Sequence, residues 1–224
     1  MREVVLDTET TGLSAKDGDR LVEIGCIELE NHLPTGRVYH QYINPTIPMP
    51  PEAQKIHGLS DEFLKDKPVF SKIAEAFLDF ISDAKLIIHN ANFDISFINA
   101  ELERGGLSTI SIDQTVDTIA VTRKKYPGAP ASLDALCRRF NIDNSARTLH
   151  GALLDAELLS EVYLELIGGR QPALVLETSE VSDEGFEVVK RKRLAPRPHQ
   201  PTERELEKHN EFIQKLRNPL WKLN

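Results

Sequence analysis

The sequence has little cysteine, no long apolar run and fewer basic than acidic residues. No apolar stretch approaches the ~20 residues that cross a bilayer, which excludes a membrane-spanning protein. Cys26 and Cys137 lie in apolar patterns without a partner at C-x-x-C spacing. We therefore expect buried thiols in a reducing compartment, with neither a disulfide nor a zinc knuckle. No signal-peptide pattern opens the sequence, so a cytoplasmic protein is expected.

The shortage of basic charge limits how the protein can meet nucleic acid. Its 224 residues include 27 lysines and arginines against 35 acids, a net charge of −8. This balance argues against the broad basic surface of a non-specific duplex-binding protein, so any contact with nucleic acid must be local. Clustered carboxylates that bind divalent cations offer one such contact, because the ions invert the local field.

Apolar patterning predicts a single α/β domain of 1–169. Three strands in an antiparallel meander are followed by strands that alternate with helices, which indicates a mixed sheet flanked by helices. A turn is expected over 31–36 and a proline-rich loop over 45–51. The expected strands are 4–9, 21–29, 38–43, the central parallel strand 86–88 and 111–117, and the expected helices are 68–81, one from about 93 to the glycines at 105–106, 119–125, 133–140 and 152–167.

The composition changes after the glycine pair at 168–169. Five acids within 177–187, four consecutive basic residues at 190–193 and three nearby prolines predict a linker over 170–201 without a core of its own. A capping-box pattern at 202–205 then opens an amphipathic C-terminal segment over 202–224. A lone helix of this length is marginal in water, so we expect it to dock on a partner.

Three acidic residues occupy positions that suggest a functional site. Asp7 and Glu9 share one face of the first strand, although an isolated D-x-E is common and alone would indicate a solvated strand end. Asp155 aligns with the apolar stripe of its helix and is expected to be buried, which requires a cation, a metal or several donors. A salt-bridged acid is the alternative, but positions 151, 152, 158 and 159, at helical spacing, are not basic.

Two further candidates depend on helix geometry. His150 and Asp155 would differ by ~140° on one continuous helix, so His150 is expected on the loop or first turn before it, a placement that suits a general base. Asp94 begins a helix at the carboxyl edge of the sheet, where α/β folds bind ligands, although an acid there also suits the helix dipole. Asp117 ends the next strand, and we expect a structural or supporting role for it.

Four motifs together resemble a known family. The sequences at 5–12 (VLDTETTG), 88–94 (IHNANFD), 132–137 (SLDALC) and 147–155 (RTLHGALLD) look like the motifs of the DEDDh exonucleases. The likeness covers roughly residues 3 to 169 and is greatest to the members that proofread for bacterial DNA polymerase III. It implies a ribonuclease-H-like mixed β-sheet flanked by helices, with a flexible C-terminal tail.

The resemblance also implies roles for individual residues. Asp7, Glu9, Asp94 and Asp155 would hold two divalent ions, Mg²⁺ or Mn²⁺, with His150 as the catalytic base. The segment 51–58 resembles the family's substrate-contacting segment, although a plain surface loop is the alternative. Glu52 and His57 would therefore lie near the terminal nucleotide, beside Asp7, Glu9 and Asp155.

The remaining expectations concern the C-terminal tail, residues 170–224. Gln171, Leu174 and Leu176 resemble a clamp-binding peptide, for which an ordinary linker is the alternative. The implied partners are a single-stranded 3′ end of DNA, the polymerase III alpha (catalytic) subunit, the beta sliding clamp and the small theta subunit. The implied activity is 3′→5′ removal of mispaired DNA nucleotides. The rival interpretations are a stand-alone exoribonuclease and a non-catalytic scaffold that bridges polymerase and clamp.

Overall fold

The computed structural model describes residues 1–145, 147, 149–168 and 201–216. The chain forms two units, Met1–Leu174 and Val175–Asn224. None of the described helices combines the length and the apolar composition needed to span a bilayer. Residues 170–200 of the predicted linker, including Gln171, Leu174 and Leu176 of the expected clamp-binding peptide, and the segment 217–224 lie outside the described residues.

A five-stranded mixed sheet forms the centre of the first unit, in the order β3-β2-β1-β4-β5. The first three strands make the predicted antiparallel meander, and β4 and β5 run parallel to β1. The mixed sheet is thus confirmed, with β4 inside it. The strands are β1 (Arg2–Thr10), β2 (Leu21–Glu30), β3 (Leu33–Tyr42), β4 (Lys85–Ile88) and β5 (Thr115–Asp117).

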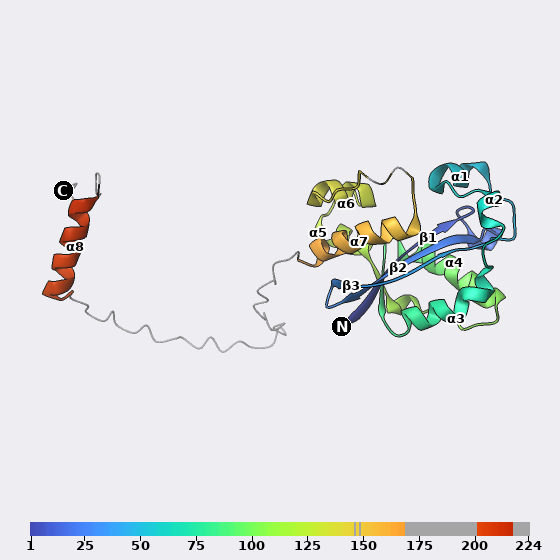
Figure 1. The fold of residues 1–224 in the computed structure, drawn as a ribbon, viewed down its shortest axis with the longest axis horizontal. Helices are drawn as coiled ribbons and strands as arrows, with labels where there is room; N and C mark the ends of the chain where they lie inside the picture. The colour runs from blue at the N-terminus through green and yellow to red at the C-terminus, as the bar shows by residue number, and fades with distance from the viewer. Residues whose placement is uncertain (146, 148, 169–200, 217–224) are drawn as a thin grey trace, which may run out of the picture. The chain divides into compact units, whose positions relative to one another are not determined.

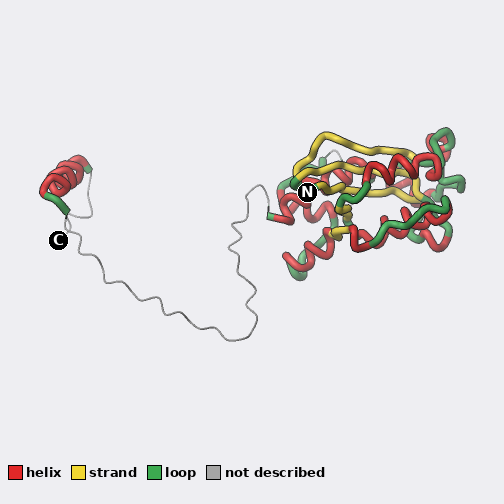
Figure 2. Tube along the Cα trace, turned by 90° about the horizontal axis from the view of Figure 1, so that it is seen from below, coloured by secondary structure: helices red, strands yellow, loops and turns green. Residues whose placement is uncertain are grey.

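Helices cover both faces of this sheet (Figures 1 and 2). Val4 and Leu6 pack with α3 and α4, whereas Val5 packs with α6 and α7. Because side chains alternate along a strand, Asp7 and Glu9 follow Val5 on the α7 side. The helices are α1 (Pro51–His57), α2 (Asp61–Leu64), α3 (Phe70–Ile81), α4 (Ala91–Arg104), α5 (Thr118–Lys125), α6 (Leu133–Phe140) and α7 (Ala152–Ile167), with short 3₁₀ turns at Ala15–Asp17 and Ile112–Gln114.

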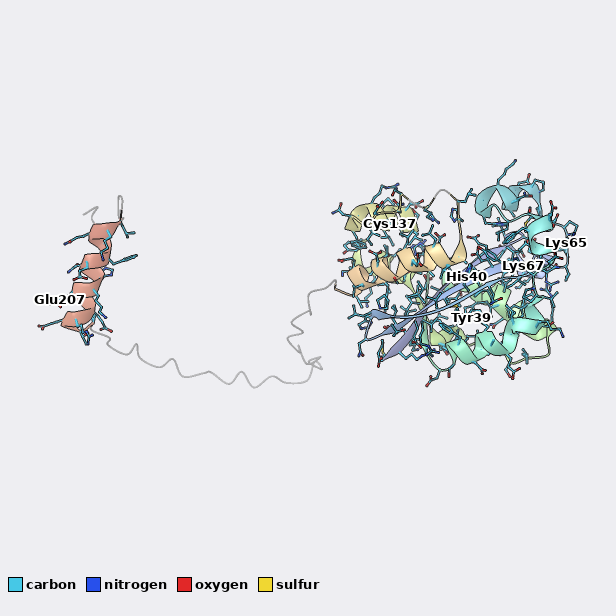
Figure 3. The ribbon with its side chains drawn as sticks, viewed as in Figure 1. Tyr39, His40, Lys65, Lys67, Cys137 and Glu207 are labelled. Atoms are coloured by element: carbon cyan, nitrogen blue, oxygen red, sulfur yellow. The ribbon has the colours of Figure 1, made fainter. Side chains whose placement is uncertain are left out.

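The best-predicted helices have clear boundary signals. The bounds of α6 and α7 agree with the expected ranges. The Ser132 hydroxyl caps α6 by accepting from the Ala135 N–H at 3.3 Å. Gly106, at φ +70°, follows the end of α4, as the glycine pair predicted. Both cysteines are buried and free, Cys137 within α6 (Figure 3).

Three local expectations were wrong. The β2–β3 turn is only Asn31 and His32, and β3 already begins at Leu33, because an edge strand tolerates a proline and an irregular register. The last strand starts at Thr115, after a 3₁₀ turn. The helix expected from 68 begins only at Phe70, with Val69 at its N-cap. The segment 51–57, for which a plain surface loop was the alternative, forms helix α1, started by a proline at its first position and ended by a left-handed glycine.

The second unit contains α8 (Glu203–Lys215), to which the labelled Glu207 belongs (Figure 3). The predicted capping box is present: the Thr202 N–H donates to Glu205 Oε2 at 2.8 Å. Leu206 and Phe212 are exposed along this helix, whereas Ile213 is buried.

Candidate active site

Four carboxylates from three elements converge at one edge of the sheet. Asp7 and Glu9 lie near the carboxyl end of β1, and Asp94 lies in the first turn of α4, directly after β4. Because β1 and β4 are parallel, their carboxyl ends meet at the same edge. Asp155 enters from the first turn of α7. All four line one cavity of about 430 Å³, together with His150 and Arg147.

The close approach of α7 to the sheet depends on a glycine. Gly25 pairs with Asp7 in the sheet. A Cβ atom at Gly25 would lie 2.4 Å from the backbone of Ala152 and Leu153, closer than any side chain allows. Glycine at this position therefore lets the first turn of α7, with Asp155, reach the acids of β1.

The acids are largely withdrawn from solvent. Glu9 is 8% exposed, Asp94 2% and Asp155 3%. The Thr8 hydroxyl donates to Asp94 Oδ1 at 2.7 Å and holds that carboxylate at the strand end. Potential ligand atoms of Glu9, His150 and Asp155 all lie within 4.8 Å of one another. Such spacing allows the three groups to share one cation.

Burial, reinforced by nearby negative charge, raises the pKa values of Asp7, Glu9 and Asp94. Burial raises the pKa of Asp7 well above its ordinary value, and the charges of Asp94, Glu9 and Asp155 raise it further. Burial, then repulsion by Asp155, raises the pKa of Glu9 to about 8. Burial raises the pKa of Asp94 to about 7, against the hydrogen bond from Thr8. A bound divalent cation would favour the ionised forms of all four.

These raised pKa values predict a pH-dependent stability. Glu9 and Asp94 have folded-state pKa values of about 8 and about 7, against ordinary values of 4.5 and 3.8. Between the ordinary and the folded-state pKa of each group, the metal-free folded state therefore binds more protons than the unfolded state. Its stability falls as the pH rises through that range. At up to ~1.4 kcal/mol per group and pH unit, we expect the melting temperature to drop by several degrees between about pH 6.5 and about pH 8.5.

Thermal denaturation with and without millimolar Mg²⁺ measures this effect. Burial lowers the pKa of His57 and His89, so these residues oppose the trend only below their ordinary value of 6.5. Mg²⁺ should remove the drop, and Glu9→Gln should reduce it. A metal-free melting temperature that stays constant over this range would contradict the electrostatic description.

Arg147 supplies Asp155 with a basic partner, which was not found among the positions at helical spacing. Its Nε donates to Asp155 Oδ1 at 2.5 Å and its Nη2 to Oδ2 at 2.7 Å. Its Nη1 donates to Asp134 at 2.8 Å. The residue comes from the loop before α7, so a search at helical spacing could not find it, although it stands in the quoted motif at 147–155. One guanidinium compensates Asp155 but cannot neutralise four converging acids.

His150 lies outside α7, as predicted, because the helix begins at Ala152. Its side chain is 48% exposed, and its Nδ1 lies 3.3 Å from Asp155 Oδ2. Its backbone N–H donates to the Ile56 carbonyl at 3.0 Å, which ties it to α1. Arg147 Nη2 lies 2.8 Å from Nδ1. Because a guanidinium only donates, Nδ1 is the accepting nitrogen here and a neutral ring carries its proton on Nε2.

Glu52 and His57 line a neighbouring cavity of about 480 Å³. This cavity shares Thr8, Glu9 and Phe93 with the acid-lined one, so the two are adjacent. His57 is buried, and its Nδ1 accepts from the Leu59 N–H at 3.0 Å. Its Nε2 therefore carries the proton of the neutral ring and has no partner among the described residues. Helix α1 thus presents a buried N–H donor beside the acids, close to the Thr10 backbone.

His89 and Asp117 also lie at this edge. His89 lines the acid cavity and contacts the Thr118 hydroxyl through Nδ1 at 2.9 Å; its buried Nε2 has no partner among the described residues. We did not single out His89 from the sequence, although the motif at 88–94 contains it. The Asp117 carboxylate accepts from the Ile119 N–H at 2.9 Å and from the Asn90 N–H at 3.2 Å. Its contacts are those of a helix cap, in line with the structural role expected for it.

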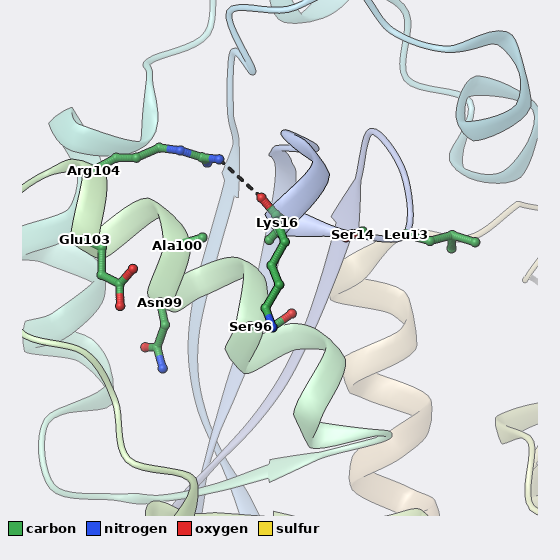
Figure 4. Close-up of a pocket in the computed structure, with 9 residues that line it drawn as sticks. Leu13, Ser14, Lys16, Ser96, Asn99, Ala100, Glu103 and Arg104 are labelled. Atoms are coloured by element: carbon green, nitrogen blue, oxygen red, sulfur yellow. Dashed lines mark hydrogen bonds between the residues drawn. The ribbon is translucent and has the colours of Figure 1, made fainter.

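A larger hollow of about 700 Å³ lies between α4 and the β1–β2 connection (Figure 4). Arg104 closes one side of it by donating to the Ala15 carbonyl at 3.5 Å. Lys16 and Glu103 give the rest of the wall mixed charge. No cluster of acids converges there among the described residues, so size alone does not identify the site.

The sequence of this chain is similar to that of known exonucleases. Residues 4–163 match the family described as Exonuclease. The DNA polymerase III subunit epsilon of Rickettsia felis is 50% identical over 222 residues, which are 96% of this chain and 97% of the relative. The protein of the same name from Escherichia coli K12 is 46% identical over 198 residues, 85% of this chain and 82% of the relative.

Solved structures show the same fold at lower identity. The nuclease domain of 3′hExo, a DEDDh family member bound to rAMP, aligns with a TM-score of 0.65 at 15% identity, covering 74% of this chain and 91% of that one. Exonuclease I aligns with a TM-score of 0.65 at 18% identity, covering 74% of this chain and 40% of that one. These similarities support the ribonuclease-H-like fold.

Proposed function

The chain belongs to the exonuclease family, and we propose on this premise that it is the 3′→5′ proofreading subunit of a bacterial DNA polymerase III, acting in the cytoplasm. It would remove mispaired 3′-terminal nucleotides as nucleoside 5′-monophosphates. The observation that carries this proposal is the convergence of Asp7, Glu9, Asp94 and Asp155 in one cavity beside His150. The relatives named DNA polymerase III subunit epsilon supply the polymerase context.

The four acids fit a pair of hard divalent cations. They offer carboxylate oxygens, which suit Mg²⁺ or Mn²⁺ better than zinc. Burial first, and neighbouring carboxylates second, raise the pKa values of Asp7 and Glu9, and a bound cation would favour their ionised forms. We propose that Asp7, Glu9, Asp94 and Asp155 hold two such ions. When bound, two ions stabilise the attacking and leaving oxygens of an in-line displacement at phosphorus.

His150 is the proposed base that takes the proton of the attacking water. Its exposure and its position before α7 leave its ring accessible from the cavity. In the described arrangement its accepting Nδ1 is engaged by Arg147. Arg147 must therefore release Nδ1 before that nitrogen can accept a proton. Positive charge bound at Asp155 would favour this release by competing with the guanidinium.

The neighbouring cavity is proposed to receive the terminal nucleotide. It lies against Glu9 and is lined by Pro50, Ala53 and Ile56 as well as by Glu52 and His57. The buried Nε2–H of His57, which has no well-formed hydrogen bond among the described residues, offers a donor to a phosphate or sugar oxygen. Asp7, Glu9 and Asp155 would contact the same nucleotide at its scissile phosphate. These assignments give α1 a role in substrate binding.

The binding partners that we propose for the C-terminal tail are inferred from its sequence and from the relatives of the chain. The Rickettsia felis relative aligns over 96% of this chain, which includes part of the tail. We propose that Gln171, Leu174 and Leu176 bind the beta sliding clamp and that 202–224 docks on the polymerase alpha (catalytic) subunit. The theta subunit is a further proposed partner. In this division 1–169 is the exonuclease domain and 170–201 the linker.

Digestion of matched DNA and RNA oligonucleotides tests the proposed function. The purified chain with Mg²⁺ should shorten single-stranded DNA from its 3′ end and release nucleoside 5′-monophosphates. On a primer annealed to a template, it should remove a mispaired 3′ nucleotide faster than a paired one, because a mispaired end separates more easily. Preferential digestion of RNA would instead indicate an RNA-trimming enzyme. Binding to polymerase and clamp without digestion would indicate a scaffold.

A further inference from the structure

One stretch of this acidic chain is strongly basic. Residues 118–142, which span α5 and α6, contain five of the chain's 27 lysines and arginines but only one of its 35 acids. That acid, Asp134, already accepts hydrogen bonds from Arg147 at 2.8 Å and from Asn144 at 3.0 Å. The five basic residues are Arg123, Lys124, Lys125, Arg138 and Arg139, which we call the α5–α6 basic surface.

The charge of this surface is not compensated within the described part of the chain. All five side chains belong to exposed residues, and none forms an ion pair with a described residue. Lys125 Nζ donates to the Leu166 carbonyl at 2.8 Å, and the Arg139 guanidinium lies 4.6 Å from the centre of the Tyr126 ring. Lys125 Nζ also lies 5.9 Å from the centre of the Tyr126 ring, so both cations lie near this one aromatic side chain.

The basic surface adjoins the active site through the helices that carry it. Ile119 of α5 and Leu133 of α6 line the acid cavity at the amino ends of these helices. Lys124 and Arg138 lie five residues further along the same helices, a rise of ~7.5 Å and a turn of ~140° from these cavity-lining residues. Both helices lie on the α7 side of the sheet (Figure 1). The positive charge thus lies at the far ends of the two helices whose amino ends line the acid cavity.

We propose that the α5–α6 basic surface binds the phosphates of the single strand whose 3′ end occupies the active site, on the 5′ side of the terminal nucleotides. This inference rests on the proposed function. A strand held by its 3′ end can leave the cavity only in the 5′ direction, and most of the remaining surface of this acidic protein repels it. Uncompensated lysines and arginines beside the cavity provide a local path for a polyanion.

The same residues also lie in the last turns of α5 and α6, where cations suit the helix dipole. A purely structural role would therefore affect the thermal stability of the protein and not its binding of DNA. Phosphate contacts would instead change the salt dependence of binding, because each contact releases counterions. The two roles therefore predict different results, a change in thermal stability for the structural role and a change in the salt dependence of DNA binding for the phosphate contacts.

The test uses the full chain with Lys124→Gln and Arg138→Gln combined. Both residues are exposed, and neither side chain forms a hydrogen bond or an ion pair with another described residue, so the fold should be little affected. The matched control combines Lys65→Gln with Lys72→Gln, exposed lysines of α2–α3 that do not line the acid cavity (Lys65 in Figure 3). The KM for Mg²⁺-dependent digestion is measured for a single-stranded DNA 20-mer and for a trinucleotide across a range of salt concentrations.

The double variant should raise KM for the 20-mer about threefold to tenfold at low salt and lower the salt slope of log KM by ~1.4, from ~0.7 per lost phosphate contact. Its kcat, and its KM for the trinucleotide, should match wild type, as should every value of the control. An unchanged slope with normal digestion would overturn this inference alone. A lower KM would overturn it by indicating that the surface holds an acidic peptide that competes with DNA. Wild-type failure to digest either substrate would overturn the proposed function as well.

Discussion

Replacing Asp7 with asparagine is expected to lower Mg²⁺-dependent DNA digestion by on the order of 10³-fold or more, because the change removes a charged ligand at the centre of the proposed two-ion site. Burial and then the charges of Asp94, Glu9 and Asp155 raise the pKa of Asp7, and all four residues line the same cavity. Digestion of a 5′-labelled single-stranded oligonucleotide by the purified variant measures the loss.

Two observations separate this loss from misfolding. Asparagine removes like-charge repulsion within the cluster, so the metal-free variant should melt at or above the temperature of the wild type. Asp117→Asn is the matched control, because Asp117 is also an acid at a strand end but caps α5, a role that asparagine also fills. This control should keep activity within a few-fold of wild type. An Asp7→Asn protein with wild-type activity would show that the acids are not the catalytic centre.

Replacing His150 with glutamine is expected to lower kcat by roughly 10²- to 10⁴-fold, the contribution usual for a positioned proton acceptor. Glutamine cannot accept a proton at neutral pH, although it preserves hydrogen-bonding capacity. The side chain is half exposed, so stability should change by no more than ~0.5 kcal/mol. Single-turnover digestion under saturating Mg²⁺ measures the chemical step without product release.

The affinity for metal is the control for this variant. The carboxylates are the proposed ligands, so His150→Gln should bind Mn²⁺ with nearly wild-type affinity while its chemical step is slow. A loss of metal binding equal to the loss of rate would instead make His150 a ligand, which its distance to Glu9 and Asp155 would permit. Full activity in the variant would exclude both roles.

The helices that present the site could be predicted because their signals are local. Apolar residues at helical spacing, a serine cap at Ser132 and the glycines after Ile167 define α6 and α7. The ~140° offset of His150 from Asp155 places the histidine before the helix by geometry alone. The succession of strands and helices along the chain follows from the alternation of short apolar runs with helical patterns.

The partners of the acids could not be predicted because they arise from tertiary contacts. Asp94 alone is compatible with a simple dipole effect, and its burial and its bond to Thr8 require β4 to lie beside β1. Arg147 reaches Asp155 from a loop, so no periodicity reveals the pair. Helix α1 has only seven residues, too few for a clear helical period. The proline and glycine of β3 indicate a turn, but an edge strand tolerates them.

The most direct test of the central claim, that these four carboxylates hold two divalent ions, is a calorimetric titration of Mn²⁺ into the metal-free protein at about pH 8. We predict two ions bound per wild-type chain, with release of protons that grows as pH is lowered toward 7, and the loss of at least one ion in Asp7→Asn. Binding of a single ion by wild type, or unchanged binding by Asp7→Asn, would contradict the account.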